Sequence, residues 1–278
     1  EDYGLGADPR YSQNYMCQPE LARELVRAGG ISAGDRVLEI GPGLGSMTRP
    51  ALERIGSGGG LFAREIDQRF KPVLERLAAD CPALQLSWGD ALELTPDETG
   101  PVNRVLSNLP YNSTTALLTH LLAAWPGADS VAVMIQSDVW PRVNARPGTG
   151  RYGPLAVMVT SFAGPKHVRS VAPAAFEPAP HIGSAFILLD PAASPSRWPA
   201  ARRILSEGEG GIWYAFVCRL FRQRRKTVLN NLAVAEGESG PGREEAADIL
   251  ARAGIPPSAR AQQLTPDDMA RLWRVSIE

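Results

Sequence analysis

Two hydrophobic periodicities alternate through the first part of the chain. Short apolar runs typical of buried strands are separated by segments whose apolar residues recur every three or four positions, as in amphipathic helices. This pattern predicts strands at residues 35–40, 61–67, 84–88, 102–106, 131–135, 155–162 and 184–189. It predicts helices at residues 19–28, 46–54, 68–79 and 116–124. Such alternation indicates an α/β domain with a doubly wound, mostly parallel, seven-stranded sheet.

The pattern changes after residues 191–199, which are rich in proline, serine and alanine. Beyond them only helical spacing recurs, at residues 212–221, 226–235, 243–253 and 266–275. Residues 1–12 are polar and show no periodicity. We therefore predict a flexible arm at residues 1–12, an α/β domain at 13–190, a linker at 191–199 and a small α-helical domain at 200–278.

Composition narrows the class of protein. The 278 residues are 44% hydrophobic and 21% charged, as in soluble globular proteins. No apolar run approaches the roughly 18 residues that span a bilayer. Cys17, Cys81 and Cys218 are far apart and lack metal-ligand spacing, which is typical of a reducing compartment. We therefore expect a cytoplasmic protein without a metal site or membrane association. Because the net charge is −1, any nucleic-acid surface has to be a local basic patch.

A glycine-rich turn follows the first strand of the predicted sheet. Gly41, Gly43 and Gly45 separate this strand from the next helix, and glycine lets the backbone adopt positive φ and approach a ligand closely. The first N–H groups of the helix point back toward the same place. This arrangement is typical of a nucleotide-type pocket, although the same spacing also occurs in ordinary tight turns.

Two carboxylates follow at the ends of the next two predicted strands. Glu65 lies about twenty residues beyond the glycines, where an acidic side chain can accept both hydroxyl hydrogens of a ribose. The alternative for Glu65 is a solvated charge at a strand end. Asp90 follows the third predicted strand, where a carboxylate can contact a base.

The segment Asn108-Leu109-Pro110-Tyr111 has the chemistry of an amine-binding site. The Asn108 amide oxygen and the Leu109 carbonyl can accept the two hydrogens of an exocyclic amine, and Pro110 fixes the turn that directs them inward. Tyr111 offers a ring on which a base can stack. Paired acceptors can draw adenine N6 toward tetrahedral geometry and align it with an electrophilic methyl group. The alternative is an ordinary strand-to-loop turn with a core tyrosine.

Over most of its length the chain resembles the ribosomal RNA adenine N6-dimethyltransferases, a family with a class I S-adenosylmethionine-dependent methyltransferase core (Rossmann-like). The resemblance rests on the motifs above and on residues 13–16, 152–155 and 176–180. It implies that the α/β domain binds S-adenosylmethionine and is catalytic. The residues it assigns to the cofactor are Gln13, Asn14, Met16, Gly41, Gly43, Glu65, Ile66, Asp90, Ala91 and Asn108. Those it assigns to catalysis are Asn108, Leu109, Pro110 and Tyr111.

A basic segment separates two branches of this family. Residues 221–232 resemble a signature of the enzymes that dimethylate two adjacent adenosines near the 3′ end of small-subunit (16S-type) rRNA during ribosome biogenesis. The cations expected to bind rRNA phosphates are Arg219, Arg222, Arg224, Arg225 and Lys226. Arg142, Arg146 and Arg151 are expected to add a second contact. The alternative for the basic segment is a solvated helix face.

Small-subunit rRNA dimethylation is therefore the predicted function, performed by a monomer on an assembling ribosomal particle. One alternative is a large-subunit rRNA adenine N6-methyltransferase of the macrolide-resistance type, which the basic segment disfavours. The other is a non-catalytic RNA-binding assembly or transcription factor on the same fold, which an intact Asn108 to Tyr111 segment disfavours. Two departures from the family pattern, the scarcity of cations before Gln13 and a histidine at His181, predict a weaker or redistributed affinity for RNA.

Overall fold

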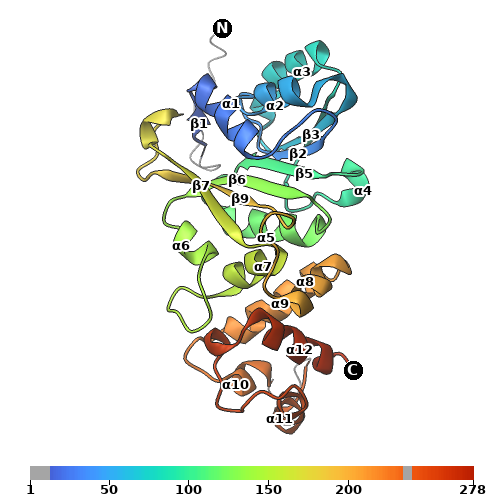
Figure 1. Ribbon diagram of the computed structural model, residues 1–278, viewed down its shortest axis with the longest axis vertical. Coiled ribbons are helices and arrows are strands. Elements are labelled where there is room, and N and C mark those ends of the chain that lie inside the picture. Colours follow the sequence, from blue (N-terminus) through green and yellow to red (C-terminus); the bar gives the residue numbers. More distant parts are fainter. Residues whose placement is uncertain (1–12, 234–239) are drawn as a thin grey trace. The chain divides into compact units, whose positions relative to one another are not determined.

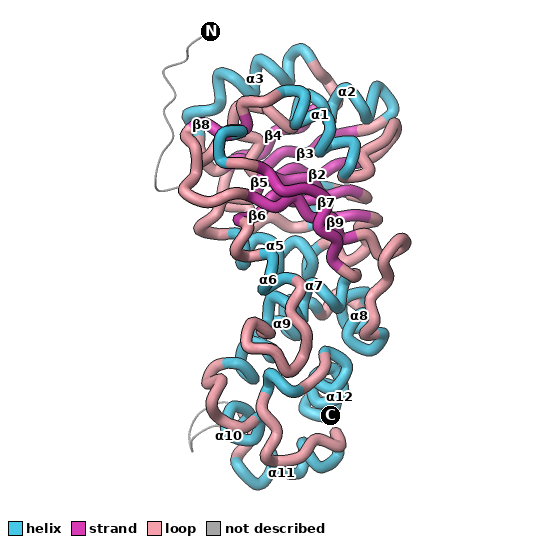
Figure 2. Tube along the Cα trace, turned by 60° about the vertical axis from the view of Figure 1, so that its left-hand side comes forward, coloured by secondary structure: helices cyan, strands magenta, loops and turns pink. Residues whose placement is uncertain are grey.

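The protein is described here by a computed structural model that covers residues 13–233 and 240–278 (Figures 1 and 2). The arm predicted at residues 1–12 lies outside the described residues. The chain divides into two compact units. Of the described residues, the first unit contains 13–120, 127–140 and 165–193, and the second contains 121–126, 141–164, 194–233 and 240–278. Among the described residues, no helix has the length and apolar character needed to cross a membrane.

The first unit is built on a central sheet. Its strands are β2 (Arg36–Ile40), β3 (Gly60–Glu65), β4 (Leu84–Trp88), β5 (Arg104–Asn108), β6 (Ser130–Gln136), β7 (Pro165–Val171) and β9 (Ser184–Leu189). They form a seven-stranded sheet in the order β4-β3-β2-β5-β6-β9-β7. Strands β4 to β6 in this order pair in parallel, whereas β9 and β7 run antiparallel to their neighbours. The predicted doubly wound, mostly parallel, seven-stranded sheet is confirmed.

Helices cover this sheet and link its strands. They are α1 (Pro19–Ala28), α2 (Thr48–Ile55), α3 (Lys71–Asp80), α4 (Pro96–Thr99) and α5 (Thr114–Ala124), with 3-10 turns η2 (Gly56–Gly58), η3 (Gln68–Phe70) and η4 (Pro173–Ala175). A further short helix, α6 (Trp140–Val143), lies where the chain passes from the first unit to the second. Figures 1 and 2 show α1, α2 and α3 on the same side of the sheet. Leu25, Ala51 and Leu77 of these helices share one buried cluster with Val37 and Leu106 of the sheet. Burial of this apolar surface is the main stabilisation of the unit.

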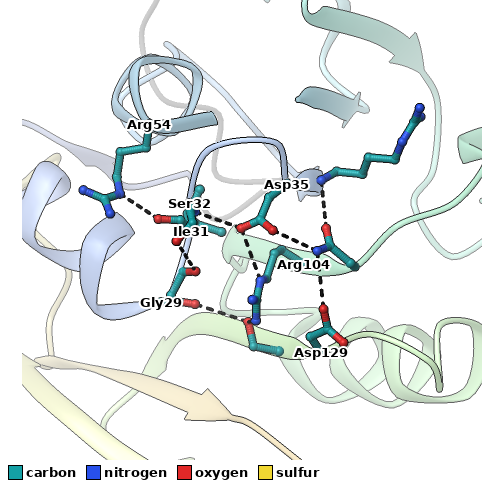
Figure 3. A network of polar contacts seen from close by, with 11 residues as sticks. Gly29, Ile31, Ser32, Asp35, Arg54, Arg104 and Asp129 are labelled. Carbon is teal, nitrogen blue, oxygen red and sulfur yellow. Dashed lines mark hydrogen bonds and ion pairs between the residues drawn. The ribbon is translucent and has the colours of Figure 1, made fainter. Parts of the chain in front are cut away.

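A network of polar side chains lies at the amino-terminal ends of β2, β5 and β6 (Figure 3). Asp35 is its centre and accepts hydrogen bonds from the Ser32 backbone N–H (2.8 Å), the Asn103 amide (2.8 Å) and the Arg104 guanidinium (3.3 Å). The Asn103 side-chain oxygen in turn accepts the Arg36 backbone N–H at 2.8 Å. A buried carboxylate with this many donors is well compensated for its loss of hydration.

Two short strands add a separate pairing to the first unit. β1 (Tyr15–Met16) and β8 (Phe176–Glu177) run antiparallel, with Tyr15 opposite Glu177 and Met16 opposite Phe176. This pairing brings together two segments that are separate motifs in the sequence, residues 13–16 and 176–180. The N-terminal segment is thereby fixed to a part of the chain that follows β7.

The second unit is helical. It contains α7 (Pro154–Phe162), α8 (Pro199–Ser206), α9 (Gly210–Phe221), α10 (Val228–Leu232), α11 (Arg243–Arg252), α12 (Pro266–Ser276) and the 3-10 turn η5 (Ala261–Gln263). The predicted helices at 212–221, 243–253 and 266–275 match α9, α11 and α12 within a few residues. α10 is shorter than the predicted helix at 226–235, the end of which lies outside the described residues.

The strand predicted at residues 155–162 is wrong, because this segment forms α7. A short, continuous apolar run has no period that separates a buried strand from a buried helix. Almost the whole of α7 is buried, and Pro154 occupies the first turn, where its missing N–H costs nothing. The strand that does follow, β7, was missed because Lys166, His167 and Arg169 make it polar, as is common for a strand at the edge of a sheet.

Candidate active site

A cavity of about 310 Å³ lies at the carboxyl ends of β2, β3, β4 and β5. The strand order reverses between β2 and β5, and α/β sheets bind ligands at such a reversal. Of the residues predicted for cofactor and catalysis, those lining the cavity are Gln13, Asn14, Gly41, Gly43, Glu65, Ile66, Asp90, Ala91, Asn108, Leu109, Pro110 and Tyr111. Met16 is instead only 6% exposed and packs in the buried cluster beneath β1.

The glycine turn forms the floor of the cavity between β2 and α2. Gly41 and Gly43 have φ of +67° and +54°, in the left-handed region that favours glycine. A Cβ at Gly43 would also lie 3.3 Å from the ring of Tyr15. Glycine is therefore required at this position both by the backbone and by the close approach of the N-terminal segment.

Glu65 connects the glycine turn to the end of β3. One carboxylate oxygen accepts the Gly43 backbone N–H at 3.0 Å, and the other accepts the Asp67 backbone N–H at 2.9 Å. Burial raises the pKa of Glu65, and these two hydrogen bonds oppose that shift. Each oxygen retains a second lone pair, so the carboxylate can still accept hydroxyl hydrogens from the cavity.

Glu39 is a site residue that the sequence analysis missed. It lines the cavity from β2, it is 2% exposed, and its Oε2 has no hydrogen-bond partner in the described part of the chain. Burial raises the pKa of Glu39 to about 8, while the Thr48 hydroxyl opposes this shift and the nearby Glu65 adds to it. The available signal was a glutamate inside an otherwise apolar strand directly before the glycine turn.

Hydrogen bonds hold the N-terminal segment across the cavity. The Gln13 amide donates to Asp67 at 2.8 Å, and Arg69 donates to the same carboxylate and to the Gln13 amide oxygen. Arg69 is the largest cause that lowers the pKa of Asp67. Asn14 presents its backbone carbonyl to the Asn108 amide at 3.0 Å. The segment is thus tied to the end of β3 and to the end of β5.

The Asn108 to Tyr111 segment leaves β5 at the cavity wall. Because Asn108 donates its amide N–H to Asn14, its side-chain oxygen faces away from that bond and remains an acceptor. Leu109 is buried, and its backbone N–H donates to the Met134 carbonyl at 3.2 Å. The Tyr111 hydroxyl lies 2.5 Å from the Ser184 hydroxyl, and burial raises its pKa. The hydroxyl is therefore an anchor for the ring and remains protonated at neutral pH.

The opposite wall of the cavity is formed by the ends of β3 and β4. Ile66 and Leu92 are exposed apolar side chains at its rim. Asp90 accepts the Leu92 backbone N–H at 2.9 Å through one carboxylate oxygen. A carboxylate between apolar side chains suits a flat base with an exocyclic amine.

The predicted RNA-binding cations lie in the second unit and differ in their surroundings. Arg222, Arg224, Arg225 and Lys226 are exposed. Arg224 donates to the Tyr152 and Gly150 carbonyls, at 2.9 Å in each case, and Arg219 donates to the Leu232 carbonyl. Two of the five arginine and lysine residues are thus engaged with the backbone of their own unit.

Comparison with known proteins gives consistent matches. The family model "Ribosomal RNA adenine dimethylase" matches residues 5–276. The chain is 37% identical to a ribosomal RNA small subunit methyltransferase A from Magnetococcus marinus, over 98% of this chain and 92% of the relative. It is 36% identical to the protein of the same name from Deinococcus radiodurans, over 94% of this chain and 83% of the relative.

Solved structures agree in fold. A dimethyladenosine transferase from Plasmodium falciparum has a TM-score of 0.69 at 21% identity, covering 92% of this chain and 94% of that one. The 23S rRNA methyltransferase ErmE has a TM-score of 0.59 at 21% identity, covering 95% and 100%. The predicted class I methyltransferase fold, with S-adenosylmethionine as cofactor, is confirmed together with the predicted enzyme class. By the match along nearly its whole length, the chain belongs to the ribosomal RNA adenine dimethylase family.

Proposed function

We propose that the protein transfers two methyl groups from S-adenosylmethionine to N6 of each of two adjacent adenosines near the 3′ end of small-subunit rRNA. The observation that carries this proposal is the orientation of Asn108 in the cavity. Its amide N–H is bound to the Asn14 carbonyl, so its oxygen is left to accept a hydrogen from an incoming amine. The high identity to small-subunit relatives favours this branch over large-subunit methylation.

The cavity has the charges that S-adenosylmethionine requires. Two buried carboxyl groups with raised pKa, Glu39 and Glu65, line it. A cationic ligand stabilises their ionised forms, and the cofactor carries both an ammonium and a sulfonium group. We assign Glu39 and the turn at Gly41 and Gly43 to the methionine part, Glu65 to the ribose, and Asp90 to the adenine amine.

Substrate positioning is the main catalytic contribution we assign to Asn108 to Tyr111. When bound, S-adenosylmethionine supplies an electrophilic methyl group. The Asn108 oxygen and the Leu109 carbonyl accept the two hydrogens of adenine N6 and direct its lone pair toward this methyl group. The Ser184 contact holds the Tyr111 ring in place for stacking on the base. No strong general base is required, because the proton leaves after the nitrogen has become cationic.

The helical unit is proposed to bind rRNA phosphates. Arg222, Arg225 and Lys226 are exposed and suit this role, as do Arg142, Arg146 and Arg151. The target adenosine has to leave its stack to reach a cavity of this kind. We propose that the protein acts as a cytoplasmic monomer on an assembling small-subunit particle.

Methyl transfer to two substrates tests the proposal. Labelled S-adenosylmethionine is incubated with the protein and either unmethylated small-subunit particles or protein-free large-subunit rRNA, and the modified nucleosides are identified by mass. We expect dimethyladenosine in the small-subunit particle only. Label in the large-subunit RNA would assign the protein to the other branch. Cofactor binding without transfer to either RNA would favour a binding protein.

A further inference from the structure

Arg64 is a buried cation in the wall of the cofactor cavity, and no motif assigns it a role. It is the β3 residue before Glu65, it is 9% exposed, and it lines the cavity together with Gly89 and Asp90. Burying a guanidinium costs more free energy than burying an apolar side chain of similar size. Its contacts therefore indicate what this position contributes.

The far end of the Arg64 side chain connects three segments around the adenine side of the cavity. Nη1 donates to the Ser87 hydroxyl of β4 at 2.5 Å, and it forms an ion pair with the Glu98 carboxylate at 3.4 Å. Glu98 lies in α4, where it also closes the first turn by accepting the Thr95 backbone N–H at 3.2 Å. Arg64 thus links β3, β4 and α4.

The guanidinium also lies against the turn that carries Asp90. A Cβ built on Gly89 would be 2.9 Å from Nη2 and 3.2 Å from Cζ of Arg64, so a side chain here would displace the guanidinium, and the φ of +141° also favours glycine. The Gly89 backbone N–H donates to the Glu65 carbonyl at 2.9 Å. The turn is therefore held by a hydrogen bond to β3 and by contact with the Arg64 guanidinium.

We propose that Arg64 is a positioning residue that sets the Gly89–Asp90 turn and thereby the recognition of the adenine amine by Asp90. This inference rests on the proposed placement of the cofactor. Asp90 uses one carboxylate oxygen for the Leu92 N–H, so the direction of the other depends on the backbone of the turn. Loss of the guanidinium lets the turn relax and weakens the contact to the amine, while the ribose and methionine contacts remain.

Cofactor analogues separate this role from general stabilisation. Isothermal titration calorimetry of the full chain measures the affinity for S-adenosylhomocysteine and for its analogue in which the adenine 6-amine is replaced by hydrogen. Because the amine adds one charge-assisted hydrogen bond, we expect the wild-type protein to bind S-adenosylhomocysteine about tenfold more tightly than the analogue. In Arg64→Met, which keeps a side chain of similar length, we expect this preference to fall to about onefold to twofold. The affinity for the analogue should change less than twofold.

Two further variants make the test decisive. Arg104→Met is the control, because it removes the guanidinium that pairs with Asp35 at the amino-terminal ends of the strands, away from the cavity. It should leave the tenfold preference for the adenine amine unchanged, even if it lowers thermal stability. Ser87→Ala removes one of the two partners of Nη1 with little change in volume, while the Glu98 carboxylate remains. It should reduce the preference about threefold, and it carries the test if Arg64→Met does not fold.

The outcomes distinguish the inference from the function on which it rests. An unchanged preference in Arg64→Met, or in Ser87→Ala where that variant carries the test, would overturn the role of Arg64 while leaving the proposed cofactor site in place. A wild-type protein that binds S-adenosylhomocysteine without preferring the amine would remove the role of Asp90 and that of Arg64 with it. A wild-type protein that binds neither compound would contradict the proposed function itself.

Discussion

Similar polar residues lie at both ends of strands β2 and β5, but they differ in whether all polar atoms of their side chains have hydrogen-bond partners among the described residues. At the amino-terminal end, Asp35 and Asn103 are buried or half-buried and fully engaged with donors and acceptors of the network in Figure 3. At the carboxyl-terminal end, Glu39 has an oxygen without a partner among the described residues, and Asn108 keeps its oxygen available. The polar groups at the amino-terminal end stabilise the fold. Those at the carboxyl-terminal end each have an oxygen atom that lacks a partner among the described residues, and a ligand can supply one.

The asparagine at each end of β5 gives the largest expected difference. Asn108→Ala should lower the rate constant of methyl transfer by roughly 10³-fold, because one aligned acceptor at the reacting amine is lost. Single-turnover transfer to small-subunit particles measures this. Asn103→Ala is the matched control, and it should leave the rate unchanged while lowering the free energy of unfolding by about 2 kcal/mol. Equal rate losses in both variants would contradict the division between the two ends.

Removing the central carboxylate of the amino-terminal network tests its structural role. Asp35→Ala leaves the Arg104 guanidinium without its ion-pair partner and the Ser32 N–H without its acceptor. We expect the free energy of unfolding to fall by about 3 kcal/mol in urea titrations. The cofactor affinity of the folded fraction should not change, and a tenfold loss of that affinity would show that the two ends are coupled.

Glu39 predicts a pH dependence of stability in the cofactor-free protein. Its pKa is raised from 4.5 to about 8, so its neutral form favours folding at low pH and this contribution is lost as pH rises toward 8. Between pH 6 and pH 8.5, the wild-type free energy of unfolding should fall by about 2 kcal/mol more than that of Glu39→Gln. Urea titrations at the two pH values measure this difference. The cofactor should suppress it with release of protons, and parallel pH profiles without cofactor would refute the assignment.

The basic segment also contains both side chains that are bound within the protein and side chains that are available to a ligand. Arg224 and Arg225 are both exposed, but the Arg224 guanidinium is bound to the Tyr152 and Gly150 carbonyls. Arg225→Ala should weaken RNA binding about fivefold and lower the slope of log K against log salt by about 0.7 to 0.9, as expected for one lost phosphate contact. In Arg224→Ala we expect faster proteolysis of the 144–153 loop, which Arg225→Ala should not show. Filter binding across a salt series and limited proteolysis provide the two measurements.

Sequence patterns predicted the sheet and most of the residues that line the cavity, because both depend on local chemistry. A buried strand followed by glycines is recognisable from the residues alone, and so is the Asn108 to Tyr111 turn. The helix at residues 154–162 was missed because a fully buried apolar segment has no polar face to reveal its period. Tertiary contacts determine whether such a segment forms a helix or a strand, and a single sequence does not show these contacts.

The cavity residues that the sequence did not indicate and the burial of Met16 have a similar cause. Glu39 and Arg64 lie inside strands, where the sequence pattern shows only that a charged residue interrupts an apolar run, and the folded cavity shows what each side chain faces. Met16 follows a cofactor-lining segment, but the alternation of a strand turns successive side chains to opposite sides, and Met16 packs into the core. Arg224 carries a charge like its neighbours, and its position beside the two carbonyls is a property of the fold.

The pairing of Tyr15 with Glu177 has a consequence for biosynthesis. The first segment needed for the cavity leaves the ribosome early, but its partner strand follows after about ten to thirty seconds of translation. During that interval the N-terminal segment has no edge to pair with, and the glycine turn lacks its cover. A nascent chain that has not reached residue 177 therefore lacks the strand that pairs with Tyr15 and Met16, and the N-terminal segment gains this contact only late in synthesis.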